Sequence, residues 1–332
     1  MRNSASRGLL LAFVGALLWG VSGTAMQFLF AMRHVSAEWM VTARMLVSGV
    51  LLLGLCAVRY PRTVLAVWRD ATSVKSLLLF ALLGMISVQY TYFAAIRASN
   101  AATATVLQYT GPVMIAAWYA FRERRLPGRF ETLSIVLAIA GTWLLVTHGD
   151  PSSLSVSPAA LFWGLASAVA FAVYSIQPLS LMRRYPAPVV LGWAMLIGGI
   201  AFSFVRAPWD IEGQWDAPAV SAAAFAILGG TLVAFLVYIQ ATKLIGARRA
   251  SLTASAEPLS ATLISVAWLH VPFGLFDIAG TACIIATIVL LTLKRPAEAP
   301  AELASPAEKK KRRRGCRRRL SSKRESPYGL VD

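Results

Sequence analysis

The segment SNAATATVLQYTGP at residues 99–112 is apolar, is built mostly of small residues, and ends in a proline. A second segment, IGARRASLTASAEP at 245–258, aligns with it when the chain is shifted by 146 positions (258 − 112 = 146). This shift superposes Pro112 on Pro258, and it also superposes small residues such as Ala104 on Ala250. The pair therefore predicts an internal repeat, in which one structural unit occurs twice.

The composition indicates a membrane protein. Of 332 residues, 57% are hydrophobic and 14% are charged, whereas a soluble domain is about half apolar and about a quarter charged. The charges cluster between apolar runs of about 18 or more residues, which is the length that an α-helix needs to cross a bilayer. The alternating segments of about ten residues that are typical of membrane barrels are missing from the sequence. We therefore predict an all-α polytopic membrane protein.

Ten transmembrane helices are predicted, and the first is too long for a cleaved signal peptide. They cover roughly 8–30, 37–58, 75–96, 100–121, 129–147, 159–181, 188–205, 219–241, 248–269 and 274–293. The predicted domains are a five-helix repeat at 1–147, an extracytoplasmic linker at 148–158, a second five-helix repeat at 159–293 and a disordered polybasic cytoplasmic tail at 294–332. Because each repeat has an odd number of spans, the two repeats should be inverted relative to each other, as in many secondary transporters.

Basic residues in the loops predict the orientation, since Lys and Arg are retained on the cytoplasmic side. With the N-terminus inside, the cytoplasmic loops contain the basic clusters at 59–75, 122–129 and 243–249. The opposite loops carry Arg33, Arg97 and Arg206. Both termini are therefore predicted to be cytoplasmic. In the tail, KKKRRRGCRRR at 309–319 is expected to contact anionic lipid rather than nucleic acid.

Two charged residues are expected deep within spans, the acid Glu257 and the base Arg44. A charge in the bilayer core costs about 3 kcal/mol or more, so each is a candidate functional residue. Glu257 is predicted to recognise a cation or to exchange protons, and the alternative is a structural acid tied to a neighbouring helix. Because the two predicted depths nearly meet at the midplane, we hypothesise that Arg44 and Glu257 pair, directly or through water. The alternative for Arg44 is bonding to helix carbonyl groups.

Pro112 and Pro258 are predicted hinges, because proline removes a helical hydrogen bond and frees a carbonyl group one turn earlier. Polar and aromatic side chains within spans should face the bundle interior, where they either line a substrate path or join helices. The expected cavity residues are Trp19, Gln27, Gln89, Tyr92, Gln108, Tyr109, Tyr174 and Tyr238. Aromatic faces of this kind could hold an ammonium group through cation–π contacts.

The sequence contains no HExxH, GxSxG or P-loop motif, so transport would have to use a gradient or run downhill. The cysteines, Cys56, Cys283 and Cys316, are scattered along the chain. We therefore predict no disulfide, no metal site and no cofactor.

Several phrases resemble the EamA family of the drug/metabolite transporter superfamily. They are ALLWG at 16–20, TARMLVSG at 42–49, NAATATVLQYTGP at 100–112, RERRLPG at 122–128 and AEPLSA at 256–261. The resemblance covers about 8–293 and implies a central cavity lined by spans 1, 3, 4, 6, 8 and 9. Arg44, Glu257 and Pro258 match common family positions. The segment LHVPFG at 269–274 lacks the acid found at Glu123, so strictly symmetric gating is not expected.

The resemblance implies a secondary-active or facilitative alternating-access transporter in a bacterial inner (plasma) membrane. Its expected substrates are small polar metabolites such as amino acids or amines, which it would export or exchange, with protons as a candidate coupling ion. Two alternatives from other classes remain open at this point. One is a non-transporting membrane receptor or assembly subunit, and the other is an integral-membrane enzyme.

Overall fold

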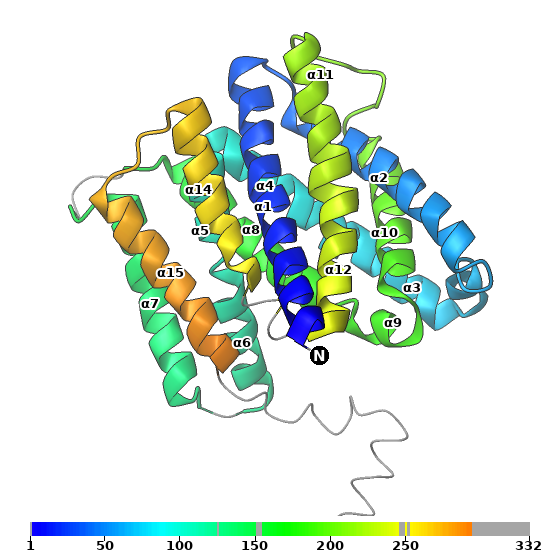
Figure 1. Ribbon diagram of the computed structural model, residues 1–332, viewed down its shortest axis with the longest axis horizontal. Coiled ribbons are helices and arrows are strands. Elements are labelled where there is room, and N and C mark those ends of the chain that lie inside the picture. The colour runs from blue at the N-terminus through cyan, green and yellow to red at the C-terminus, as the bar shows by residue number, and fades with distance from the viewer. Residues whose placement is uncertain (1, 125, 151–154, 246–249, 251–252, 294–332) are drawn as a thin grey trace, which may run out of the picture. The chain divides into compact units, whose positions relative to one another are not determined.

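A computed structural model describes residues 2–124, 126–150, 155–245, 250 and 253–293 (Figure 1). Every regular element in this part of the chain is helical. The elements are α1 (Arg2–Met32), α2 (Ala37–Arg59), η1 (Ala66–Arg69), α3 (Ala71–Leu79), η2 (Phe80–Ile86), α4 (Ser87–Ala98), α5 (Ala101–Gln108), α6 (Gly111–Arg122), α7 (Arg129–Thr147), α8 (Pro158–Ile176), α9 (Leu179–Arg184), α10 (Ala187–Phe202), α11 (Ala217–Ala224), η3 (Phe225–Val233), α12 (Ala234–Ile245), α14 (Ala256–Leu269) and α15 (Leu275–Leu293).

Six helical stretches among the described residues are long and apolar enough to cross a membrane. Shorter apolar helices at Ala187–Phe202, Ala256–Leu269 and Leu275–Leu291 accompany them, and α5 with α6 makes up the remaining span. The described elements thus follow one another as ten spans, which confirms the predicted all-helical membrane fold. The basic tail lies outside the described residues, so its contact with anionic lipid stays a prediction.

The fourth span is broken near its middle. α5 and α6 are separated by a turn at 109–110, and Pro112 lies in the first turn of α6. Proline is tolerated there, because the first amides of a helix have no partner within the helix. α14 begins in the same way at Ala256, with Pro258 in its first turn. The continuous helix expected at 100–121 is therefore two helices that meet beside a proline.

The third and eighth spans each contain a π-helical segment, η2 and η3. In both, a glycine packs against the ring of a phenylalanine four residues earlier. A methyl group on Gly84 would lie 2.8 Å from the Phe80 ring, and one on Gly229 would lie 2.9 Å from the Phe225 ring. The matching phrases are FALLG at 80–84 and FAILG at 225–229. The third span of each repeat therefore carries a π-helical segment with the same phrase, a feature that we did not predict.

Helices of the first half pack mainly against helices of the second half. α2 packs along α10, α4 packs along α8, and α1 packs against both α12 and α14. Figure 1 shows α1 between α14 and α12. The largest cluster of buried apolar side chains draws on both halves, for example Met26 and Phe80 from the first and Met195 from the second. The two repeats thus share one core.

Ion pairs join the loops on the predicted outer side. Arg33, just after α1, contacts Asp216 at 2.9 Å, and Asp216 also accepts a hydrogen bond from the amide of Ala219 in the first turn of α11. The pKa of the Asp216 carboxyl is lowered, chiefly by the hydrogen bond from Arg33 and further by the Ala219 amide. Arg97 and Glu38 form a second pair at 3.1 Å, between α4 and α2.

Candidate functional site

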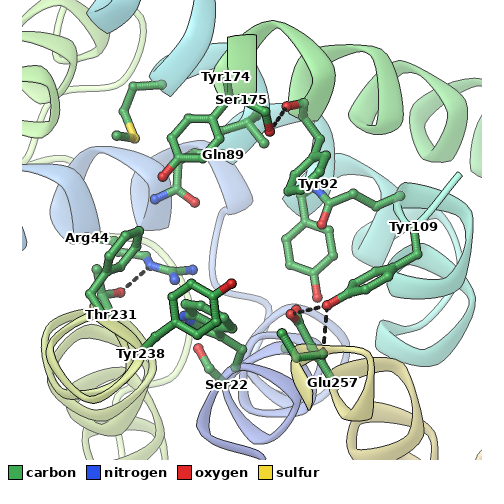
Figure 2. Close-up of a pocket in the computed structure, with 18 of the residues that line it drawn as sticks. Ser22, Arg44, Gln89, Tyr92, Tyr109, Tyr174, Ser175, Thr231, Tyr238 and Glu257 are labelled. Carbon is green, nitrogen blue, oxygen red and sulfur yellow. Dashed lines mark hydrogen bonds between the residues drawn. The ribbon is translucent and has the colours of Figure 1, made fainter. Parts of the chain in front are cut away.

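A cavity of about 340 Å³ lies inside the bundle, within the range of about 300–1,000 Å³ that is typical of small-molecule sites. Helices from both repeats line it. They are α1, α2, η2, α4, α5 and α6 from the first half and α8, α10, η3, α12, α14 and α15 from the second. Figure 2 shows its aromatic and polar side chains arranged around an open centre. This placement between the halves is where inverted-repeat transporters hold their substrates.

Most of the predicted site residues line this cavity. They are Trp19, Gln89, Tyr92, Gln108, Tyr109, Tyr174 and Tyr238, together with Arg44, Glu257 and Pro112. Gln27 does not, because its side-chain oxygen accepts a hydrogen bond from the amide of Ala101 at 2.9 Å. That amide begins α5 and has no partner within the helix, so Gln27 caps the broken fourth span. Pro258 is buried in the first turn of α14 and does not line the cavity.

Tyr109 joins the two proline-marked helix starts at the cavity wall. Its hydroxyl lies 2.7 Å from Oε2 of Glu257 and 3.1 Å from the carbonyl oxygen of Ala254, and it can donate to either atom. Ala254 is four residues before Pro258, which has no N–H to donate to that carbonyl group. The proline therefore leaves the Ala254 carbonyl group free, as predicted, and Tyr109, a donor that we did not predict, bonds to it.

Arg44 is held by side chains other than Glu257. Its Nε donates a hydrogen bond of 2.7 Å to Oγ1 of Thr231, and its guanidinium carbon lies 5.4 Å from the ring centroid of Phe93. Within the described residues, Arg44 and Glu257 form no direct ion pair. The hypothesis of direct pairing needs correction, because Thr231 and Tyr109 each bind one of the charged groups. Both charges instead face the same cavity.

Thr231 is a residue that the sequence analysis missed. It lies in the π-helical segment η3, where its hydroxyl donates to the carbonyl oxygen of Ala226, five residues earlier, at 3.1 Å. The same hydroxyl oxygen accepts the hydrogen bond from Arg44. π-helical turns occur frequently at functional sites. The signal that could have indicated this segment is the repeated phenylalanine–glycine phrase, FALLG and FAILG.

Several polar groups at the cavity have no protein partner in the described part of the chain. The side chains of Gln89, Gln108, Tyr174 and Tyr238 make no hydrogen bond there. The hydroxyl of Ser22 is buried, lines the cavity and also lacks a partner. The buried Ser22 hydroxyl gains free energy when it finds a partner, and the four part-exposed side chains have polar atoms available to a ligand, so this wall is suited to a polar ligand.

Residues 6–147 and 158–293 each match the EamA-like transporter family. The chain belongs to this family. By this family assignment the protein is a membrane transporter and not an enzyme. The cavity described above is therefore the candidate substrate site of an EamA transporter.

Two relatives and one solved structure are similar to this chain. The uncharacterized inner membrane transporter YicL of Salmonella typhimurium is 36% identical, over 88% of this chain and 97% of its own length. The uncharacterized transporter YwfM of Bacillus subtilis is 24% identical, over 77% of this chain and 84% of its own length. A solved structure described as "Crystal structure of protein" has a TM-score of 0.59 at 20% identity, covering 87% of this chain and 97% of that chain, and has the same fold. The first relative supports the predicted inner-membrane location.

Proposed function

We propose that this EamA transporter is a secondary-active or facilitative alternating-access transporter, and that it exports or exchanges small polar metabolites such as amino acids or amines. The observation that carries the proposal is the cavity between the two repeats, which holds one basic and one acidic side chain, Arg44 and Glu257. Placing charges away from water is costly, so their presence at a cavity favours a role in recognising a polar substrate. The Pro112 and Pro258 helix starts beside them are the proposed hinges.

Alternating access requires that the contacts across the cavity break and re-form. The Tyr109 hydroxyl bonds to Glu257 and thereby joins the first repeat to the second through a single side chain. A substrate that competes for Glu257 would weaken this link. We infer that the broken helices on either side of the link move relative to each other during transport.

Proton coupling is part of the proposal and centres on Glu257. The groups that surround it at the cavity are the hydroxyls of Tyr92, Tyr109 and Tyr238 and the guanidinium group of Arg44. A carboxylate that alternates between a proton and a cationic substrate would link the two fluxes. Glu257 is suited to this role because it is the acidic residue lining the cavity in the described part of the chain.

The test is flux in liposomes that contain the purified protein. Preloaded amino acids and amines should leave the vesicles faster than from protein-free vesicles, and an imposed pH gradient should change the rate. Glu257→Gln should abolish the effect of the gradient, whereas Asp210→Asn in the exposed outer loop should retain it. Ligand binding without flux would identify a receptor instead, and an unchanged pH response in Glu257→Gln would exclude the coupling role.

A further inference from the structure

The two charged side chains of the cavity come from different sides and are bound by different neighbours. Figure 2 shows Arg44 beside Thr231 on one side of the cavity and Glu257 beside Tyr109 on another, with the Tyr238 ring drawn between them. Arg44 belongs to α2 and Glu257 to α14. The cavity is therefore dipolar, with a positive end and a negative end.

The positive end is fixed in place. The Nε of Arg44 donates to Thr231, and the guanidinium carbon lies over the ring of Phe93. In the described part of the chain, the two Nη amino groups of Arg44 make no hydrogen bond. A guanidinium group presents its N–H groups in a planar fork that matches a carboxylate. Thr231 and Phe93 thus leave the outer part of this fork available to an anionic group.

The negative end retains binding capacity as well. Tyr109 donates to Oε2 of Glu257, and Oε1 has no hydrogen-bond donor among the described residues. Trp19 and Tyr238 line the same cavity and pack together, with ring centroids 5.2 Å apart. Aromatic faces next to a carboxylate are a favourable environment for an ammonium group.

We propose that this cavity binds a small zwitterion, whose anionic group bonds to the Nη amino groups of Arg44 and whose cationic group faces Glu257. Thr231 is the positioning residue that holds Arg44 for this contact. The proposal rests on the proposed function and narrows its substrate class. A simple amine would leave Arg44 without a counter-ion, and a simple acid would leave Glu257 without one, and an unpaired buried charge is unfavourable.

The first experiment measures binding of matched probes to the detergent-purified full chain by thermal shift and calorimetry. The zwitterionic probes are L-phenylalanine and the linear ω-amino acids from glycine to 6-aminohexanoate, since the series varies the separation of the two charges. Each is compared with the amine that lacks the carboxylate and the acid that lacks the ammonium group. At least one zwitterion should bind about tenfold or more tightly than both of its counterparts, as expected for one charge-assisted hydrogen bond at each end.

The second experiment tests the assignment of the two ends. Arg44→Gln should remove the preference for the zwitterion over the amine, and Glu257→Gln should remove its preference over the acid. Thr231→Val should reduce the zwitterion-to-amine affinity ratio, and Thr231→Ser, which keeps the hydroxyl, should restore it. A general loss of folding would weaken the binding of all probes together, whereas a loss of Arg44 positioning would change the zwitterion-to-amine affinity ratio. The melting temperature of each variant, measured without ligand, identifies any that are unfolded.

The outcomes separate this inference from the proposed function. If no zwitterion binds more tightly than its amine and acid counterparts, or if Arg44→Gln keeps the wild-type ratio, the inference is wrong. Transport would still stand if an amine or an acid crosses liposomes that contain the protein. If a zwitterion binds with the expected ratios but does not cross them, the inference holds and the proposed transport function fails.

Discussion

The hydroxyl oxygen of Tyr109 lies 2.7 Å from a carboxylate oxygen of Glu257, and this bond connects the break between α5 and α6 to the first turn of α14. Both partners lie directly beside a proline-marked helix start, at Pro112 and at Pro258. Proline prevents a continuous hydrogen-bond ladder at each place. The side-chain bond therefore links the two repeats at the places where the backbone hydrogen bonds are interrupted.

Tyr109→Phe should lower stability, because it leaves Glu257 and the Ala254 carbonyl group without their hydroxyl donor. We expect a loss of about 1–3 kcal/mol, the cost of an unsatisfied buried acceptor. Thermal unfolding in detergent measures it. Tyr174→Phe is the matched control, since the Tyr174 hydroxyl has no hydrogen bond in the described part of the chain. Equal melting temperatures for the two variants would contradict this role for Tyr109.

Two glycines on α2 should respond in opposite ways to alanine. A methyl group at Gly49 would lie 2.7 Å from the backbone nitrogen of Leu196 on α10, whereas one at Gly54 would meet nothing within 4 Å. Gly49→Ala should destabilise the bundle by about 1–3 kcal/mol through overpacking. Gly54→Ala should stabilise it by up to about 1 kcal/mol through helix propensity.

Unfolding of both glycine variants in denaturant, at one detergent concentration, would compare them directly. The contrast depends on the packing of α2 against α10, so a Gly49→Ala protein as stable as Gly54→Ala would show that this contact is looser than described.

The sequence predicted the spans and most of the cavity because both depend on local chemistry. Long apolar runs indicate spans by themselves, and Arg44 and Glu257 stand out because they interrupt such runs. Gln27 looked equally suitable for the cavity, but its role as the cap of α5 depends on how α1 packs against a helix distant in sequence. Similar residue types in a span thus do not reveal which neighbour each one meets.

Thr231 could not be assigned from helical periodicity. A π-helical turn shifts the direction of every following side chain, so positions expected to face one way face another. The shift in η3 places the Thr231 hydroxyl against Arg44 and the carbonyl of Ala226. The direct Arg44–Glu257 pair was the simplest expectation for two buried charges. Instead, Arg44 bonds to Thr231 and Glu257 accepts from Tyr109, and the two charged groups reach the cavity from different helices, α2 and α14.

The Arg33–Asp216 pair should make stability depend on pH at the acid end. The pKa of Asp216 is lower in the folded chain than its ordinary value of 3.8, so the ionised form contributes stability above that value. This contribution is lost as the pH falls through the lower, folded pKa. Asp216→Asn should therefore melt at a lower temperature than wild type near neutral pH, and the difference should shrink as the pH falls below about 4.

Melting curves of wild type and Asp216→Asn across the acid range provide the measurement. The effect should be small, because the Asp216 side chain is 46% exposed. In an Arg33→Gln background, Asp216→Asn should change the melting temperature less than in wild type. A difference that stays constant with pH would assign the effect to helix packing and not to the ion pair.

The predicted orientation places the loop at 203–216 outside the cell and the loop around 60–70 in the cytoplasm. The outer loop contributes Trp215, which packs against Trp39 with ring centroids 5.0 Å apart, as tryptophans often do at a membrane interface. Two single-cysteine variants, Gln214→Cys and Arg62→Cys, report on the two sides of the membrane, because both native side chains are exposed. They are made in a chain in which Cys56, Cys283 and Cys316 are replaced by serine. A membrane-impermeant maleimide should label Gln214→Cys in intact cells and Arg62→Cys only after the membrane is opened, since basic loops are retained inside. The reverse labelling pattern would show that the topology is opposite to the predicted one, with the basic tail at 294–332 on the outer side.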